Sequence, residues 1–239
     1  MDHTDTIIIG AGQAGLATSY HLSRENREHI ILEKKRIGDA WRNAKWDSFT
    51  LVTPNWMLNL PGCPYRNADS DDYLTRDEMV FYLEDYARRY QMPVKEGVAV
   101  RSVESAGHGK GFIVHSDEGY LHANHVVVAT GTFQKPGLPE CQPGLSTSLH
   151  QLHSSEYKNP SELPPGAVLV VGSAQSGCQI AEELNDHGRR VYLATGKANR
   201  MPRTYRGKDS FWWAKQLGLF DQTIDDLPSP EARFIPNPQ

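Results

Sequence analysis

Cysteine is scarce in this chain of 239 residues, and none of its three cysteines belongs to a Cys-x-x-Cys pair. Enzymes that exchange disulfides with a bound flavin need two thiols close together, so the pattern disfavours that class. The ten histidines show no recognisable spacing with a cysteine or a third ligand, and we therefore expect no metal site.

The chain also lacks a basic excess and a long apolar run. Its net charge of −4 argues against nucleic acid as a partner. No apolar stretch approaches the roughly 18 residues that a membrane-spanning helix needs, and the first predicted strand leaves no room for a signal peptide before it. We expect a cytoplasmic protein that binds neither membranes nor nucleic acid, with one large domain or two small ones.

Two glycine motifs are the most informative feature that the sequence does contain. Each follows an apolar strand, at 6–9 and 168–171, and each opens a helical stretch. This context separates a dinucleotide-binding turn from a chance run of glycines. The glycines permit a tight turn and a close approach of the backbone to pyrophosphate, which the free N–H groups of the helix N-terminus bind. Two such turns predict two dinucleotides and favour hydride transfer from a nicotinamide to a flavin. The predicted contact residues are Gly10, Gly12, Gln13, Ala14 and Gly15 in the first turn, and Gly172, Ala174, Ser176 and Gly177 in the second.

After each glycine turn come a helix and then another strand. The residue at the end of that strand differs between the two predicted sites. Glu33 lies 23 residues after Gly10, at the separation expected for a carboxylate that binds ribose hydroxyls. The equivalent position of the second site is Thr195, which would not repel the 2′-phosphate of NADPH. Arginines follow it, among which we select Arg200 and Arg203 as phosphate ligands. The alternative is a solvated basic surface.

The pattern of elements predicts an α/β fold with two Rossmann-like units. A helix capped by Thr75 should present an apolar face that includes Met79, 81–83 and Tyr86. Short strands at 98–103, 112–115 and 120–123 predict an antiparallel meander, and 126–130 predicts a separate buried strand. The stretch 38–65 is expected to be irregular. We predict an FAD-binding domain at 1–139, a connector at 140–165 and a partial NADPH-binding domain at 166–239.

Several further motifs occur in a fixed order along the whole chain. They are 38–42 (Gly-Asp-Ala-Trp-Arg), 51–56 (Leu-Val-Thr-Pro-Asn-Trp), 60–62 (Leu-Pro-Gly), 129–131 (Ala-Thr-Gly) and 153–157 (His-Ser-Ser-Glu-Tyr). Together with the two glycine turns they resemble the flavin-containing monooxygenases, in particular the bacterial branch related to the plant auxin-forming enzymes.

This resemblance implies FAD at the first turn, NADPH at the second, and oxygenation of a small organic substrate by dioxygen through a flavin hydroperoxide. It implies that Asn55 is catalytic, because this position matches a family asparagine whose amide contacts the flavin and nicotinamide region. The alternative for Asn55 is a purely structural role in a turn. The alternative for the tryptophans assigned to the cofactors is packing in the core. Other residues assigned to the cofactors are Lys34, Trp41, Trp46, Ala129, Thr130 and Gly131.

Members of this family return from the nicotinamide domain to complete the flavin domain, whereas this sequence stops soon after the second unit. We therefore expect the N-terminal part of such an enzyme. Three functions remain open: a competent monooxygenase or NADPH oxidase without coupled oxygenation, a truncated nucleotide-binding module, and an interaction protein that pairs through an open sheet edge. A homo-oligomer is compatible with each of them.

Overall fold

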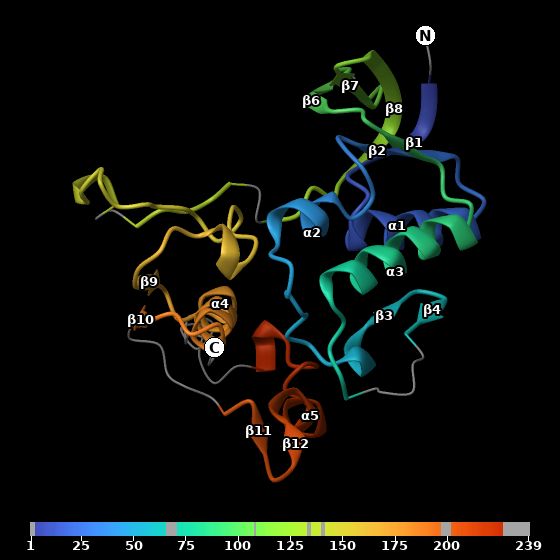
Figure 1. The fold of residues 1–239 in the computed structure, drawn as a ribbon. Coiled ribbons are helices and arrows are strands. Elements are labelled where there is room, and N and C mark those ends of the chain that lie inside the picture. The colour runs from blue at the N-terminus through green and yellow to red at the C-terminus, as the bar shows by residue number, and fades with distance from the viewer. Residues whose placement is uncertain are drawn as a thin grey trace. The chain divides into compact units, whose positions relative to one another are not determined.

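The computed structural model describes residues 3–65, 71–107, 109–132, 135–139, 142–196 and 202–226. The chain divides into two compact units (Figure 1). The described residues of unit 1 lie within Met1–Trp46, Asn59–Tyr65 and Leu74–Tyr157. Those of unit 2 lie within Asp47–Leu58, Arg66–Tyr73 and Lys158–Gln239. Each unit contains one of the two glycine turns.

Unit 1 is built on a six-stranded sheet with the order β5-β2-β1-β8-β7-β6. Strand β1 is parallel to β2 and β8, and β2 is parallel to β5. Strands β6 and β7 continue the sheet in antiparallel fashion beyond β8. The strands are β1 (His3–Ile9), β2 (His29–Glu33), β5 (Val94–Glu96), β6 (Val100–Ser105), β7 (Phe112–Ser116) and β8 (Gly119–Val128).

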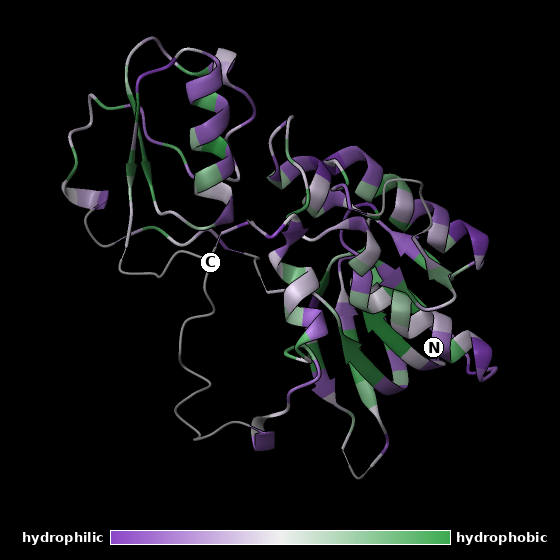
Figure 2. Ribbon diagram, turned by 90° about the horizontal axis from the view of Figure 1, so that it is seen from below, coloured by the Kyte–Doolittle hydropathy of each residue, from purple (hydrophilic) through white to green (hydrophobic). Residues whose placement is uncertain are grey.

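The core of unit 1 forms where this sheet meets its helices. Ile7, Ile8 and Ile31 are fully buried in adjacent parallel strands, as β-branched residues of a covered sheet are expected to be. Apolar residues line these strands, and polar residues cover the outer faces of the helices (Figure 2). The helices are α1 (Gln13–Arg24), α2 (Asp39–Ala44) and α3 (Arg76–Arg89), and a short hairpin joins β3 (Asn59–Leu60) to β4 (Cys63–Pro64).

Helix α3 starts as its sequence predicts. Thr75 Oγ1 accepts a hydrogen bond from Glu78 N at 3.3 Å, and Glu78 Oε2 accepts from Thr75 N at 2.9 Å, so the capping box is confirmed. Three tyrosines one turn apart, two on α3 and one at its C-cap, hold the β3–β4 hairpin through its backbone carbonyls. Their hydroxyls donate from Tyr82 to Cys63 O, from Tyr86 to Pro61 O and from Tyr90 to Gly62 O.

Some expectations about unit 1 were wrong in detail. The stretch 38–65 is not wholly irregular, because α2, β3 and β4 lie in it. Segments 120–123 and 126–130 are not separate strands, since β8 runs from the meander into the parallel sheet, and Val128 is 70% exposed rather than buried. Phe81 was placed on the buried face of α3, whereas it is exposed and Val80 is buried instead.

Unit 2 contains the second glycine turn between a parallel pair of strands and a helix. The pair is β9 (Val168–Val171) with β10 (Val191–Ala194), and α4 (Gln175–Asp186) connects them. Ile180, Ala181 and Leu184 are the buried residues of α4. After α4 the guanidinium of Arg189 donates to the carbonyls of Leu163 at 2.7 Å and Pro164 at 2.8 Å, which fixes the segment that leads into β9.

A second small element completes unit 2. Strands β11 (Thr204–Tyr205) and β12 (Lys208–Asp209) form an antiparallel hairpin that leads directly into helix α5 (Ser210–Gln216). Arg206 and Gly207 form its two-residue turn, with φ of 48° and 71°. Positive φ at both central positions is typical of the type I′ turn that joins such tight hairpins.

The short 3₁₀ segments of unit 2 are Asn55–Met57, Pro160–Glu162 and Ile224–Asp226, and that of unit 1 is Gln142–Gly144. No helix in the described part of the chain is long and apolar enough to cross a membrane.

Candidate functional site

The first glycine turn has the geometry that its sequence predicts. Gly10 has a φ of 105°, in the region that glycine adopts readily, and a Cβ there would lie 2.6 Å from Ala129 O. A Cβ on Gly15 would lie only 1.9 Å from Gly10 O, so helix and strand approach too closely for any side chain. Gly12 differs, because a Cβ there would meet nothing within 4 Å. The space in front of Gly12 is therefore open to a ligand.

Helix α1 begins at this turn with its N-terminal N–H groups available. Its N-cap residue, Gly12, offers no side-chain hydrogen bond, and its first turn holds no acidic residue. Gln13 and Ala14 are exposed there. The contrast is α3, which has a capping box and two acidic residues in its first turn. An uncapped N-terminus with a positive dipole is suited to bind an anion such as phosphate.

Glu33 lies beside this turn, at the end of β2. Its Oε2 accepts a hydrogen bond from Ala11 N at 2.8 Å, and its Oε1 accepts from Lys35 N at 3.1 Å. The acid that was selected by its spacing therefore contacts the glycine turn itself. Lys34 is exposed next to it. A carboxylate at this position can also accept hydrogen bonds from a ribose.

Glu33→Gln should weaken binding of a dinucleotide at the first turn by about 1–2 kcal/mol, because charge-assisted hydrogen bonds are replaced by neutral ones. Isothermal titration of the apoprotein with FAD measures this change. Glu28→Gln, an exposed acid ahead of β2, is the matched control and should bind as the unmodified chain does. An unchanged affinity in Glu33→Gln would remove the acid from the site.

The end of β8 also lies at the first turn. Ala129 N donates to Ile9 O at 2.9 Å, and the same residue's carbonyl is the atom nearest to a Cβ on Gly10. Thr130 and Gly131 follow and are exposed, with Gly131 at a φ of 75°. The carboxyl ends of β1 and β8 are thus adjacent, which is where open α/β sheets bind ligands.

The two tryptophans assigned to the cofactor occupy different environments in unit 1. Trp41 is half-buried in α2, with Lys45 Nζ at 5.9 Å from its ring centroid. Burial lowers the pKa of the Lys45 amine, a residue that the sequence reasoning did not select. Trp46 is 1% exposed and its ring centroid lies 6.5 Å from that of Tyr157, so it packs in the core.

The second glycine turn, in unit 2, shares two features of the first, although Ala174 replaces its middle glycine and a Cβ on Gly172 would meet nothing within 4 Å. Gly172 has a φ of 103°, and a Cβ on Gly177 would lie 1.9 Å from Gly172 O. Ala174 is the N-cap of α4 and makes no side-chain hydrogen bond, and the first turn of α4 has no acidic residue. Ser176 is half-buried in that first turn. Because the geometry matches that at Gly10 and Gly15, unit 2 offers a second phosphate-binding helix terminus.

Unit 2 also holds Asn55, the predicted catalytic residue. Asn55 is 5% exposed and begins a 3₁₀ turn, and its backbone N–H donates to Asp72 O at 2.8 Å. In the same unit, Gln179 of α4 donates from Nε2 to Thr50 O at 3.2 Å. Segments 47–58 and 71–73 are therefore tied to each other and to α4 inside unit 2.

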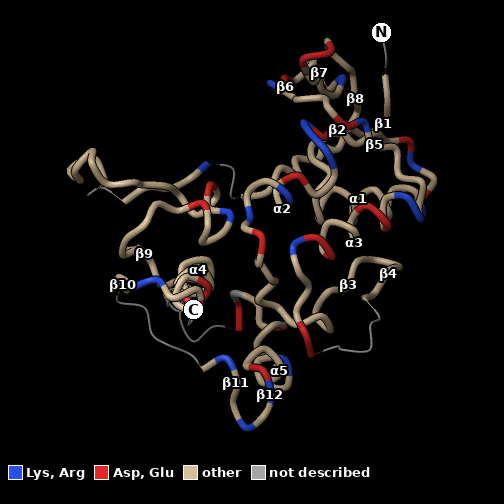
Figure 3. Tube along the Cα trace, viewed as in Figure 1, with Lys and Arg blue, Asp and Glu red and all other residues tan. Residues whose placement is uncertain are grey.

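Among the described residues after β10, the basic ones next along the chain lie on or just before the β11–β12 hairpin. Thr195 is exposed just after β10, and Arg200 lies outside the described residues. Lys and Arg residues occur along the hairpin (Figure 3), with Arg206 in its turn. Arg203 precedes β11, and its Nε lies 3.0 Å from Asp209 Oδ2 and 3.2 Å from the Tyr73 hydroxyl. Sequence reasoning missed Tyr73 and Asp209, since no motif joins positions so far apart.

The described residues give no group of three histidine, cysteine or acidic side chains that could hold a metal ion. Among them Cys63 is buried and Cys178 is exposed, and neither forms a disulfide; Cys141 lies outside the described residues.

The chain is similar to known oxidoreductases in sequence and in structure. The sequence matches the pyridine nucleotide-disulphide oxidoreductase family over residues 7–211. An uncharacterised CzcO-like oxidoreductase of Geobacillus kaustophilus is 44% identical over 94% of this chain and 64% of its own length. A probable indole-3-pyruvate monooxygenase of Arabidopsis thaliana, YUCCA8, is 30% identical over 88% of this chain and 52% of its own.

A solved structure extends the likeness to three dimensions. A variant of the flavin monooxygenase of Stenotrophomonas maltophilia has a TM-score of 0.79 and 29% identity, and the match covers 90% of this chain and 64% of that one. This likeness confirms the predicted α/β fold with its dinucleotide-binding units. The chain spans less than two thirds of the length of these relatives. It belongs to the pyridine nucleotide-disulphide oxidoreductase family, and the resemblance to flavin-containing monooxygenases that its motifs predicted is confirmed.

Proposed function

We propose that this chain is the nucleotide-binding part of an FAD-dependent, NADPH-dependent oxidoreductase that oxygenates a small organic substrate with dioxygen. The observation that carries the proposal is the pair of glycine turns with one geometry, each opening an uncapped helix without an acid in its first turn. Two phosphate-binding termini in one chain suit two dinucleotides. Membership of the family and the likeness to flavin monooxygenases support the same assignment.

FAD is assigned to the first turn. A pyrophosphate there would accept hydrogen bonds from the free N–H groups of α1, and the open space at Gly12 admits it. Glu33 would bind the ribose, and Ala129, Thr130 and Gly131 would lie beside the nucleotide at the end of β8. When bound, FAD would accept a hydride and react with dioxygen, chemistry that no side chain of the protein can supply.

NADPH is assigned to the second turn, where Gly172, Gly177 and the N-terminus of α4 would hold its pyrophosphate. Thr195 stands at the ribose position, where many such sites have an acid. An acid there would repel the 2′-phosphate of NADPH, and threonine does not. Asn55 is our candidate for the catalytic residue, and its buried backbone is fixed by Asp72.

Thr195→Asp should lower the affinity for NADPH by about tenfold or more and raise that for NADH relative to the unmodified chain, because a negative charge is placed near the 2′-phosphate. Thr195→Asn is the matched control, since it has nearly the same size without the charge. Dissociation constants for both coenzymes check the result. Equal binding of NADPH and NADH by the unmodified chain would contradict the assignment.

The oxygenation itself is tested by accounting for the electrons of NADPH. In air, with FAD and a panel of ketones, thioethers, amines and indolic keto acids, NADPH consumption should equal oxygenated product for at least one class. Consumption matched only by hydrogen peroxide would favour the alternative of an NADPH oxidase without coupled oxygenation. No NADPH consumption at all would favour a nucleotide-binding module.

A further inference from the structure

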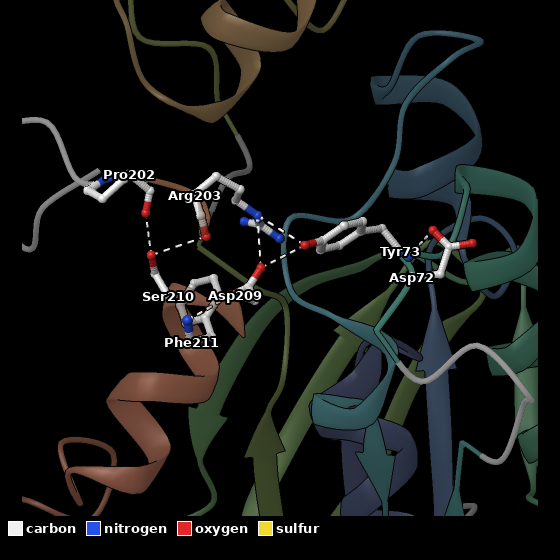
Figure 4. Close-up of polar contacts among 7 residues, drawn as sticks. All are labelled: Asp72, Tyr73, Pro202, Arg203, Asp209, Ser210 and Phe211. Carbon is white, nitrogen blue, oxygen red and sulfur yellow. Dashed lines mark hydrogen bonds and ion pairs between the residues drawn. The ribbon is translucent and has the colours of Figure 1, made fainter. Parts of the chain in front are cut away.

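We propose that Tyr73 is a positioning residue that holds the Arg203 guanidinium ready to bind the 2′-phosphate of the coenzyme. This inference rests on the proposed NADPH site and deepens it, since it names how one arginine of unit 2 selects the coenzyme. The residues come from two distant segments of the sequence, 71–73 and 202–211, that meet within unit 2 (Figure 4).

The Tyr73 hydroxyl lies at the centre of this arrangement. It donates to Asp209 Oδ2 at 2.6 Å and accepts from Arg203 Nε at 3.2 Å, and the same Arg203 Nε lies 3.0 Å from Asp209 Oδ2. Burial and the hydrogen bond to Asp209 raise the pKa of the Tyr73 hydroxyl, so it stays protonated as a donor. The guanidinium is therefore held at its Nε edge by two oxygen atoms.

The face of the same guanidinium is held by aromatic rings. Its central carbon lies 4.4 Å from the Tyr73 ring centroid and 5.7 Å from that of Phe211. Stacking on aromatic faces and hydrogen bonding at one edge already hold the arginine side chain in one rotamer. Binding of a ligand therefore costs less side-chain entropy than it would for a mobile arginine. Tyr73 thus fixes both the plane and the rotation of the fork.

The supports of Arg203 are themselves fixed. Its carbonyl accepts from Ser210 N at 2.9 Å and from Ser210 Oγ at 3.1 Å. Asp209 uses its second oxygen, Oδ1, to accept from Phe211 N at 2.7 Å, and so caps helix α5. Tyr73 N donates to the Asp72 carboxylate at 2.8 Å. Figure 4 shows these contacts, which restrain both segments.

Within the described ranges, no hydrogen bond or ion pair is made by the opposite edge of the guanidinium. Among the contacts of the described residues, hydrogen bonds and ion pairs of Arg203 involve Nε alone, so its two terminal nitrogens remain for an acceptor. The Arg203 side chain is 44% exposed, whereas that of Asp209 is 11% exposed and faces inward to its donors. A planar fork with two free nitrogens matches two oxygens of a phosphate dianion.

The test compares two probes that differ only in the phosphate in question. Isothermal titration of the purified chain with 2′,5′-ADP and with 5′-AMP should give tighter binding of 2′,5′-ADP. Arg203→Met should reduce that preference by about 10-fold or more, and Tyr73→Phe, which keeps the ring and deletes one oxygen, by about 3-fold or more. Neither change should alter the binding of 5′-AMP.

A double-mutant cycle separates positioning from a merely structural role. In the Arg203→Met background, Tyr73→Phe should have no further effect on the preference, because the residue through which it acts is gone. Tyr205→Phe is the matched control, since it removes an exposed tyrosine hydroxyl of the same hairpin. Thermal midpoints verify that each variant is folded.

The outcomes distinguish this inference from the proposed function. A chain that binds 5′-AMP and 2′,5′-ADP equally would contradict the choice of NADPH itself. If the unmodified chain prefers 2′,5′-ADP but Tyr73→Phe does not reduce that preference, or reduces it equally without Arg203, the positioning role is overturned while the NADPH site stands. If Tyr73→Phe reduces the preference for 2′,5′-ADP only when Arg203 is present, the result supports the inference.

Discussion

Gly12→Val should abolish flavin retention while the fold survives. A Cβ on Gly12 meets nothing within 4 Å, and the residue has a φ of −84°, so the protein itself can accept a side chain there. The branched side chain would instead occupy the space in front of the α1 N-terminus, where the pyrophosphate is proposed to lie. Because backbone N–H groups can no longer approach the phosphates, the affinity for FAD should fall by at least about 100-fold, or roughly 3 kcal/mol.

The control for this variant is Gly144→Val. A Cβ on Gly144 also meets nothing within 4 Å, and this glycine lies in a 3₁₀ segment away from both glycine turns in the sequence. Both proteins should show the far-ultraviolet circular dichroism of the unmodified chain, but only Gly144→Val should retain FAD through gel filtration. A yellow Gly12→Val protein would place the flavin elsewhere.

Gly15→Ala should have the opposite effect and destabilise the fold before any ligand is considered. Its new Cβ would lie 1.9 Å from Gly10 O and 3.3 Å from Ile8 Cγ2, and the first of these atoms belongs to the backbone of the turn. The helix must move away from β1, which breaks packing in the centre of unit 1. We expect a loss of about 3 kcal/mol or more in the free energy of unfolding.

Urea denaturation followed by tryptophan fluorescence measures this loss. Gly177→Ala repeats the change in unit 2, where the same 1.9 Å contact with Gly172 O exists, and should be comparably severe. Gly12→Ala is the matched control and should change the midpoint little, because its Cβ is unopposed. An unaltered midpoint in Gly15→Ala would mean that the close packing of helix and strand is not required.

The parts of the fold that depend on local chemistry could be predicted from the sequence. The glycine turns were visible because glycine, spacing and flanking strands act within a few residues, and the Thr75 capping box depends on residues three apart. Glu33 was found by its separation from Gly10, and it does contact the turn at Ala11 N.

The parts that depend on distant contacts could not be predicted. The sequence pattern predicts Phe81 as a core residue. Which face of α3 is buried depends, however, on the elements that pack against the helix, and Val80 is buried while Phe81 is exposed. The break expected at 124–125 in β8 is absent because β1 pairs with the strand through this region. The anchoring of Arg203 by Tyr73 joins residues 130 positions apart, for which a single sequence holds no local signal.

The most direct test of the account is the visible absorption spectrum of the purified chain after incubation with FAD, followed by anaerobic titration with NADPH. The protein should retain the yellow colour of oxidised flavin through gel filtration, and NADPH should bleach it, with NADH less effective. A protein that stays colourless after incubation with FAD, or whose bound flavin is not reduced by NADPH, would contradict the assignment of two dinucleotide sites to this chain.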